Sequence, residues 1–353
     1  MAGVYISYPF CAQKCTYCNF ASDVLPRELE AKYVDVLKAE LHAAQWPWKP
    51  ETMYFGGGTP SQMEPEALRA LLSEIPGSPW VEATLEVAPG GLTSAKAEAW
   101  RSAGINRVSL GVQSFAPREL ARTGRKHTAE IVEREIAILR TSGIDNFNLD
   151  LIAGLPGQTA ETWKLSLDWV ERLDAPHVSV YMLEVDEDSR LGAEILAFGK
   201  RYGASDVPSD DQIADFYQTA VNRLARAGIA RYEISNFARP GFESRHNLKY
   251  WKREPYLGFG ADAHSFDGQW RWRNPENAWD YVQRPEILDR TAADPVGERF
   301  FLGLRLDEGI DAPPFTETVA QFCRDGLLET DGRRLRLTNR GVLLSNEVFA
   351  AFV

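Results

Sequence analysis

Three cysteines near the N-terminus have the residue type and the spacing of a metal-binding motif. Cys11, Cys15 and Cys18 form a C-x3-C-x2-C pattern, and Cys323 lies far away in the sequence. Thiolate ligands select iron–sulfur clusters, zinc or copper(I). A structural zinc site normally has four protein ligands, whereas this local set stops at three and leaves one iron of a cluster open. We expect a 4Fe–4S cluster here; zinc with a remote fourth ligand, or unligated cysteines, are the alternatives.

A glycine-rich segment follows the second expected strand and ends in Gly57, Gly58 and Thr59. Glycines let the backbone approach a ligand closely and leave N–H groups free to donate, although a tight turn explains the segment equally well. Polar residues also follow or interrupt later strands, namely Glu86, Gln113, Arg125 and Asp150. Each alone fits a structural hydrogen-bonding role, but a carboxylate in an apolar strand needs a partner. Together they predict a shared site.

Short β-rich runs alternate with helical stretches along the first two thirds of the chain. The expected strands are Val4–Ser7, Thr52–Phe55, Ala83–Val87, Arg107–Val112, Phe147–Ile152 and Val178–Leu183. Three helices end in Gly-Ile before a strand-like run, at Gly104, Gly143 and Gly228. Such alternation argues for a parallel sheet, and six units predict an α/β fold with a partial (β/α)6 TIM-like barrel. The cysteines then lie at the carboxyl ends of its strands, where active sites collect.

The amino-acid composition changes after about residue 238, where Trp, Arg and Pro become frequent. We predict a barrel domain at 1–238 and a smaller, mostly helical C-terminal domain at 239–353, with a hairpin strand at Leu335–Leu337. The net charge of −11, without a Lys/Arg cluster, argues against a nucleic-acid partner. With neither a run of about 20 apolar residues nor a leader pattern, we expect a cytoplasmic protein.

These motifs together resemble the radical S-adenosylmethionine superfamily, and its HemN-like branch in particular. Further matching segments are Gly111–Phe115, Asn148–Ile152 and Gly154–Gln158, so the resemblance runs over nearly the whole chain. It implies that the three cysteines ligate the cluster and that one electron cleaves the sulfonium of S-adenosylmethionine to a radical. The residues implied in binding S-adenosylmethionine are Tyr5, Tyr17, Gly57, Gly58, Thr59, Glu86, Gln113, Arg125 and Asp150.

Two functions occur within that branch: oxygen-independent coproporphyrinogen III dehydrogenase and the HemW-type heme chaperones. The dehydrogenase typically has a fourth cysteine where this chain has Phe20, and an N-terminal extension where it has about three residues. His246–Trp251 also matches the H-N-x-x-Y-W signature associated with heme binding in HemW. The resemblance therefore favours a heme chaperone over the dehydrogenase, and whether the protein is an enzyme stays open.

The signature implies a heme site made of His246, Asn247, Tyr250 and Trp251. Imidazole is a common axial ligand of heme iron, and Tyr and Trp offer flat apolar area. The alternative is that His246 and Trp251 pack a domain junction while Asn247 satisfies a turn. The implied partners are heme, heme-accepting apoproteins (respiratory enzymes are one option) and a reductant protein for the cluster, with peripheral association with membrane proteins as a further option.

Overall fold

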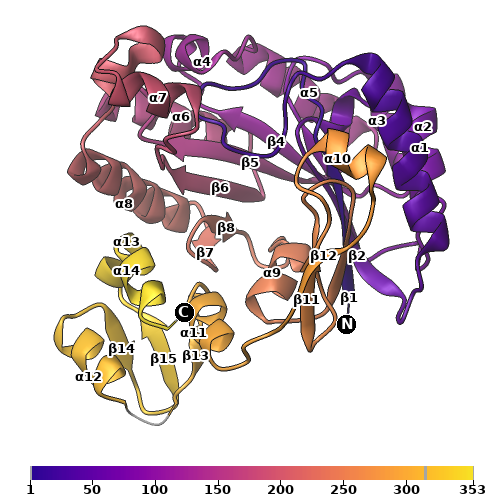
Figure 1. Cartoon of the computed structure of the whole chain (residues 1–353). Coiled ribbons are helices and arrows are strands. Elements are labelled where there is room, and N and C mark those ends of the chain that lie inside the picture. Colours follow the sequence, from indigo (N-terminus) through magenta and orange to yellow (C-terminus); the bar gives the residue numbers. More distant parts are fainter. Residues whose placement is uncertain (1, 314–315, 353) are drawn as a thin grey trace.

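Six parallel strands form the centre of the computed structural model, which describes residues 2–313 and 316–352 (Figure 1). They pair in sequential order, and each expected strand overlaps one of them. Their bounds are β1 Ala2–Tyr8, β2 Pro50–Gly57, β3 Glu82–Val87, β4 Arg107–Gln113, β5 Asn146–Ala153 and β6 His177–Met182.

Helices cover the outer face of this sheet, as the βα alternation of the sequence requires (Figure 1). In the first helix, Leu29, Leu37 and Leu41 recur at four-residue multiples and are buried, so one face of the helix packs on the sheet. The helical elements are α1 Arg27–Ala43, η1 Pro60–Gln62, α2 Pro65–Leu72, α3 Ser94–Ser102, α4 Pro117–Thr123, α5 Ala129–Thr141, α6 Ala160–Arg172, α7 Arg190–Leu196, η2 Arg201–Asp206 and α8 Asp210–Arg226.

The three Gly-Ile segments end helices as expected. Gly104, Gly143 and Gly228 have φ of +101°, +78° and +76°, the left-handed conformation that glycine adopts without strain. The N–H of the following isoleucine donates back to the helix at 3.0, 2.9 and 2.9 Å, respectively. The first two segments lead into β4 and β5, but the third leads into β7 (Ala230–Arg231), a short antiparallel edge strand. The motif therefore marks the helix end and not the direction of the next strand.

The large sheet continues beyond the six parallel strands on both sides. β8 (Asn236–Ala238) and β7 extend it past β6, and on the other side β9 (Tyr256–Phe259) pairs with β1 in parallel. Three antiparallel strands then complete it, namely β10 His264–Phe266, β11 Trp270–Arg273 and β12 Leu288–Ala292, with α9 Arg245–Trp251 and α10 Ala278–Gln283 in the connections.

This topology confirms the partial barrel, because β12 and β7 are the two edges of an open twelve-stranded sheet. The large sheet also continues past the predicted domain boundary, which stays a prediction. Residues 256–292 belong to the large sheet, so the boundary predicted between 238 and 239 does not lie where that sheet ends. The pairing of β9 with β1 joins segments about 250 residues apart, and no local pattern reveals such pairing.

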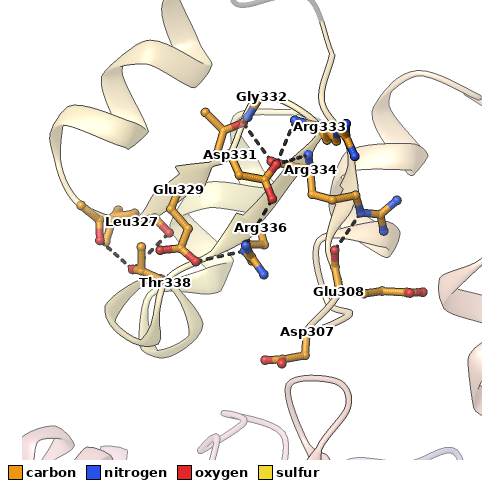
Figure 2. Close-up of polar contacts among 12 residues, drawn as sticks. Asp307, Glu308, Leu327, Glu329, Asp331, Gly332, Arg333, Arg334, Arg336 and Thr338 are labelled. Carbon is orange, nitrogen blue, oxygen red and sulfur yellow. Dashed lines mark hydrogen bonds and ion pairs between the residues drawn. The ribbon is translucent and has the colours of Figure 1, made fainter.

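The C-terminal part has its own three-stranded sheet in the order β13-β15-β14, with helices around it. The expected hairpin strand is confirmed in β15, and Figure 2 shows its turn closed by Asp331, whose carboxylate accepts the N–H groups of Arg333 (2.9 Å) and Arg334 (2.8 Å). The elements are α11 Gly297–Gly303, β13 Ile310–Asp311, α12 Glu317–Arg324, β14 Leu328–Thr330, β15 Arg334–Leu337, α13 Asn339–Leu343 and α14 Ser345–Ala350.

Candidate functional site

A cavity of about 1120 Å³ opens where the parallel strands end. Its wall brings together the three cysteines and all but one of the residues expected to bind S-adenosylmethionine. These are Tyr17, Gly57, Gly58, Thr59, Glu86, Gln113, Arg125 and Asp150. The exception is Tyr5, which lies deeper in the barrel and stacks on Tyr54 with 6.2 Å between ring centroids. The structure therefore brings eight of the nine predicted residues to the wall of one cavity.

The cysteines lie on the loop between β1 and α1, and backbone hydrogen bonds fasten this loop. The N–H of Cys11 donates to the carbonyl of Asp23 (2.9 Å), and the carbonyl of Thr16 accepts from Leu191 (2.8 Å). Across residues 2–313 and 316–352, no three cysteine, histidine or acidic side chains converge at metal-binding distance. The fold thus directs three partly exposed thiols to one cavity without closing them on a common point.

Burial raises the pKa of the Cys11 and Cys18 thiols, and the neighbouring Cys15 adds to the rise in both. Three adjacent thiolates therefore need a positive charge near them to be stable together. An iron–sulfur cluster supplies that charge, and its ligands are thiolates. The donor set fits the expected cofactor.

Glycine is required where β2 meets the cysteine loop. A Cβ on Gly58 would lie 2.6 Å from the carbonyl oxygen of Phe10 and 2.9 Å from the sulfur of Cys11. Gly57 has φ of +114° and lies against the backbone of Tyr8. These residues therefore let β2 press closely against the loop that carries the thiols.

The expectation that this segment leaves N–H groups free for a ligand is wrong. All three N–H groups have protein partners: Gly57 donates to Glu86, Gly58 to the Tyr8 carbonyl and Thr59 to the Phe10 carbonyl, at 3.1, 2.7 and 2.9 Å. The segment therefore positions the cysteine loop, and Gly57, Gly58 and Thr59 line the cavity beside it.

Glu86 is a half-buried carboxyl at the cavity wall with a raised pKa. It accepts hydrogen bonds from the hydroxyl of Tyr54 (2.8 Å) and the N–H of Gly57 (3.1 Å). Burial raises its pKa to about 7, and the nearby Asp150 acts in the same direction. A carboxyl of this kind binds an ammonium group well, because the cation both pairs with it and restores its ionised form.

Asp150 ends a chain of buried polar side chains that crosses the barrel. It accepts from the amide of Asn148 (2.7 Å) and the hydroxyl of Ser109 (3.2 Å). The carbonyl oxygen of Asn148 shares a hydrogen bond with His177 (2.7 Å), whose other nitrogen meets the hydroxyl of Tyr232 (2.8 Å). Burial raises the pKa of Asp150 while these donors lower it. The protein itself therefore compensates the buried carboxylate and fixes its orientation.

Arg125 and Tyr17 lie beside Cys15 at the wall of the cavity. Burial acts to lower the pKa of Arg125, but Tyr17 and Cys15 raise it overall, so the guanidinium stays charged. Its Nε is buried without a partner among the described residues. Gln113 ends β4 with φ of +70°, a strained conformation for a residue with a side chain.

The segment expected to bind heme lies at the other end of the barrel from the cysteines. The N–H groups of Arg245 and His246, at the start of α9, donate to the carboxylate of Glu82 at 2.8 and 2.9 Å. Glu82 is the first residue of β3. Nδ1 of His246 shares a hydrogen bond with the hydroxyl of Thr52 (2.9 Å), near the start of β2. α9 thus closes the barrel where its strands begin.

His246 is 1% exposed, and its Nε2 shares a hydrogen bond with the hydroxyl of Tyr250 (2.8 Å). Burial lowers the pKa of the imidazole to about 3. Since both ring nitrogens are engaged, His246 offers none to iron in this arrangement, which favours the alternative of a packing role. The N–H of Asn247 donates to the helix-capping hydroxyl of Ser244. None of His246, Asn247, Tyr250 and Trp251 belongs to the wall of the cavity.

The C-terminal part contributes to the cavity wall, which the sequence did not indicate. Arg305, Leu343, Ser345 and Asn346 line it together with β6 and α8 residues. They arrive there because Leu306 bridges to Glu233 beside β8.

His264 is exposed on β10, and Cys323 lies in α12 away from the other cysteines, as expected.

Two family models match the chain. Residues 5–170 match the model described as Radical SAM superfamily, and residues 291–344 match the HemN C-terminal domain. The second match begins at the end of β12, which agrees with where the large sheet ends.

Curated relatives match over the full length. The heme chaperone HemW of Bacillus subtilis is 33% identical, covering 100% of this chain and 99% of the relative, and that of Escherichia coli is 35% identical, covering 99% and 97%. Among solved structures, the coproporphyrinogen III oxidase HemN of Escherichia coli aligns with a TM-score of 0.83 at 22% identity, covering 99% of this chain and 89% of that one. That likeness shows the fold. No described helix is long and apolar enough to cross a membrane.

Proposed function

The chain belongs to the family of HemW heme chaperones, and we propose that it binds heme and delivers it to heme-accepting apoproteins. The observation that carries this proposal is similarity to HemW proteins along the whole chain at 33–35% identity. Phe20, where the dehydrogenase typically has a fourth cysteine, supports the same choice.

The proposal includes a 4Fe–4S cluster on Cys11, Cys15 and Cys18, with S-adenosylmethionine in the adjoining cavity. The match to the radical S-adenosylmethionine superfamily supports both. When bound, the cluster supplies the electron that cleaves the sulfonium bond. Three thiols on a loop held by backbone hydrogen bonds support the first assignment.

The residues proposed to hold S-adenosylmethionine have charges that complement its ammonium group, its ribose hydroxyls and its carboxylate. Glu86, with its pKa near 7, provides a partner for the ammonium group. Asp150, oriented by Asn148 and Ser109, accepts from ribose hydroxyls. Arg125 supplies positive charge beside Cys15, which favours a bound carboxylate and the anionic thiolates.

Anaerobic reconstitution followed by iron and sulfide analysis and heme titration tests this function. We expect about four irons per chain, loss of iron in Cys15→Ala, and saturable heme binding by the wild type. A wild-type protein that holds the cluster but binds no heme would contradict the chaperone role.

The competing function in this fold is coproporphyrinogen III dehydrogenase, which the fold likeness to HemN leaves available. Incubation with coproporphyrinogen III, S-adenosylmethionine and a reductant separates the two. We expect no protoporphyrinogen IX, whereas its formation together with 5′-deoxyadenosine would replace the chaperone proposal. The heme acceptors, the reductant protein, association with membrane proteins and the cytoplasmic location stay predictions.

A further inference from the structure

The cavity extends from the cysteine loop to a second wall that the C-terminal part helps to form. Met182 and Leu183 at the end of β6, Ile213 of α8 and Leu343 of α13 give this wall an apolar character. The cavity volume of about 1120 Å³ is more than three times the roughly 300 Å³ at the lower end of the range for a site that holds one small ligand. It therefore has room for a second ligand beside S-adenosylmethionine.

Arg305 is the cationic group on this second wall. Its guanidinium lies over the rings of Trp251 and Phe349, with 5.0 Å to each ring centroid. Contacts on the faces of a guanidinium fix its plane and leave the N–H groups at its edges available. The backbone carbonyl of Arg305 accepts from the N–H of Ile234 (3.0 Å), which anchors the residue beside β8.

The guanidinium of Arg305 lacks a carboxylate partner. Over residues 2–313 and 316–352, its side chain makes no hydrogen bond and no ion pair within 4.0 Å, and its Nε is buried without a partner. Neighbouring arginines differ: Arg231 pairs with Asp307, and Arg253 pairs with Glu298. A buried donor without a partner costs free energy that a ligand bonding it recovers, and here that donor is the Nε of a half-buried arginine.

Acidic groups of the protein do not fill that role. Burial lowers the pKa of Arg305, and Glu233 and Glu184 oppose this effect from farther away. Glu233 is committed to the amide of Asn236, and burial raises its own pKa. Arg305 is therefore free to bind an anion that enters the cavity.

We propose that heme binds against the second wall of the cavity. One propionate carboxylate pairs with Arg305, and the macrocycle packs against the apolar side chains of β6, α8 and α13. The inference rests on the proposed heme-binding function and names the site for it. It places heme in the same cavity as the three cysteines. His246 lies behind the cavity wall, with its ring 5.4 Å from that of Tyr54, which lines the cavity.

Heme titration of the full-length, anaerobically reconstituted protein tests this site with two arms. The first compares the wild type with Arg305→Gln, and the second compares heme with heme dimethyl ester, whose propionates carry no charge. A charge-assisted hydrogen bond of this kind corresponds to roughly 10- to 100-fold in affinity, so each change alone should weaken binding by that factor. Because the two changes remove the same contact, the variant should bind the ester no more weakly than the wild type does.

Arg299→Gln is the matched control, since Arg299 is exposed on α11 and does not line the cavity. It should bind heme like the wild type. Equal affinity of the wild type for heme and its dimethyl ester would overturn the site while leaving the chaperone function standing, and this comparison needs no variant to fold. Unchanged heme affinity in a folded Arg305→Gln would also overturn it. Absence of heme binding by the wild type would overturn the proposed function and this site together.

Discussion

Replacing His246 with alanine should destabilise the fold rather than remove a heme ligand. The imidazole joins two elements that lie far apart in the sequence, because it bonds the Thr52 hydroxyl of β2 and the Tyr250 hydroxyl of α9. It also fills space against Gly3, where an added Cβ would lie 3.0 Å from the ring. Alanine removes both hydrogen bonds and leaves a void under β1.

The expected cost follows from these contacts. A buried polar group that loses its partner costs about 1–3 kcal/mol, and Thr52 and Tyr250 are both left without one. Loss of packing adds to this, so we expect the free energy of unfolding to fall by about 3–5 kcal/mol. That is a large part of the roughly 5–15 kcal/mol that stabilises a typical folded protein.

Urea unfolding under anaerobic conditions, followed by circular dichroism, measures this change. His264→Ala is the control, because His264 is exposed and a surface substitution changes stability by about 0.5 kcal/mol or less. Heme titration of folded His246→Ala should give an affinity close to that of the wild type. Unfolding at the wild-type urea concentration together with a tenfold or greater loss of heme affinity would refute the reasoning.

The remaining predictions concern the cysteine loop, Cys323 and the titration of His246. Gly58→Ala should lower the iron content after reconstitution, because the added Cβ would meet the Phe10 carbonyl and the Cys11 sulfur, whereas Gly91→Ala, which meets nothing within 4 Å, should not; equal iron contents would contradict the positioning role. Cys323→Ala should keep the iron that Cys15→Ala loses, and a loss in both would make Cys323 a ligand. The depressed pKa of His246, about 3 in the folded state against roughly 6.5 unfolded, means that its contribution to stability is full above pH 6.5 and is lost as the pH falls toward 3. Between pH 6 and 4 the unfolding free energy of the wild type should therefore fall more steeply than that of His246→Gln, with slopes that differ by about 1 kcal/mol per pH unit. Equal slopes for the two proteins would contradict a depressed pKa of the imidazole.

The sequence by itself determined the local features of this protein. The spacing of the three cysteines, the strand-forming runs and the Gly-Ile helix ends all depend on residues within a few positions of one another. Each could therefore be predicted from the sequence alone. The convergence of Glu86 and Asp150 at one edge of the sheet could be predicted too, since the carboxyl ends of parallel strands lie together.

Only the tertiary structure decided which partners the polar groups take. The pairing of β9 with β1 continued the large sheet past residue 238. It also set α9 under the strands, so that both ring nitrogens of the buried His246 have protein partners. The bridge between Glu233 and Leu306 brought Arg305 to the cavity. Such contacts join residues that are tens to hundreds of positions apart, and their free energy depends on burial and geometry that no local spacing encodes.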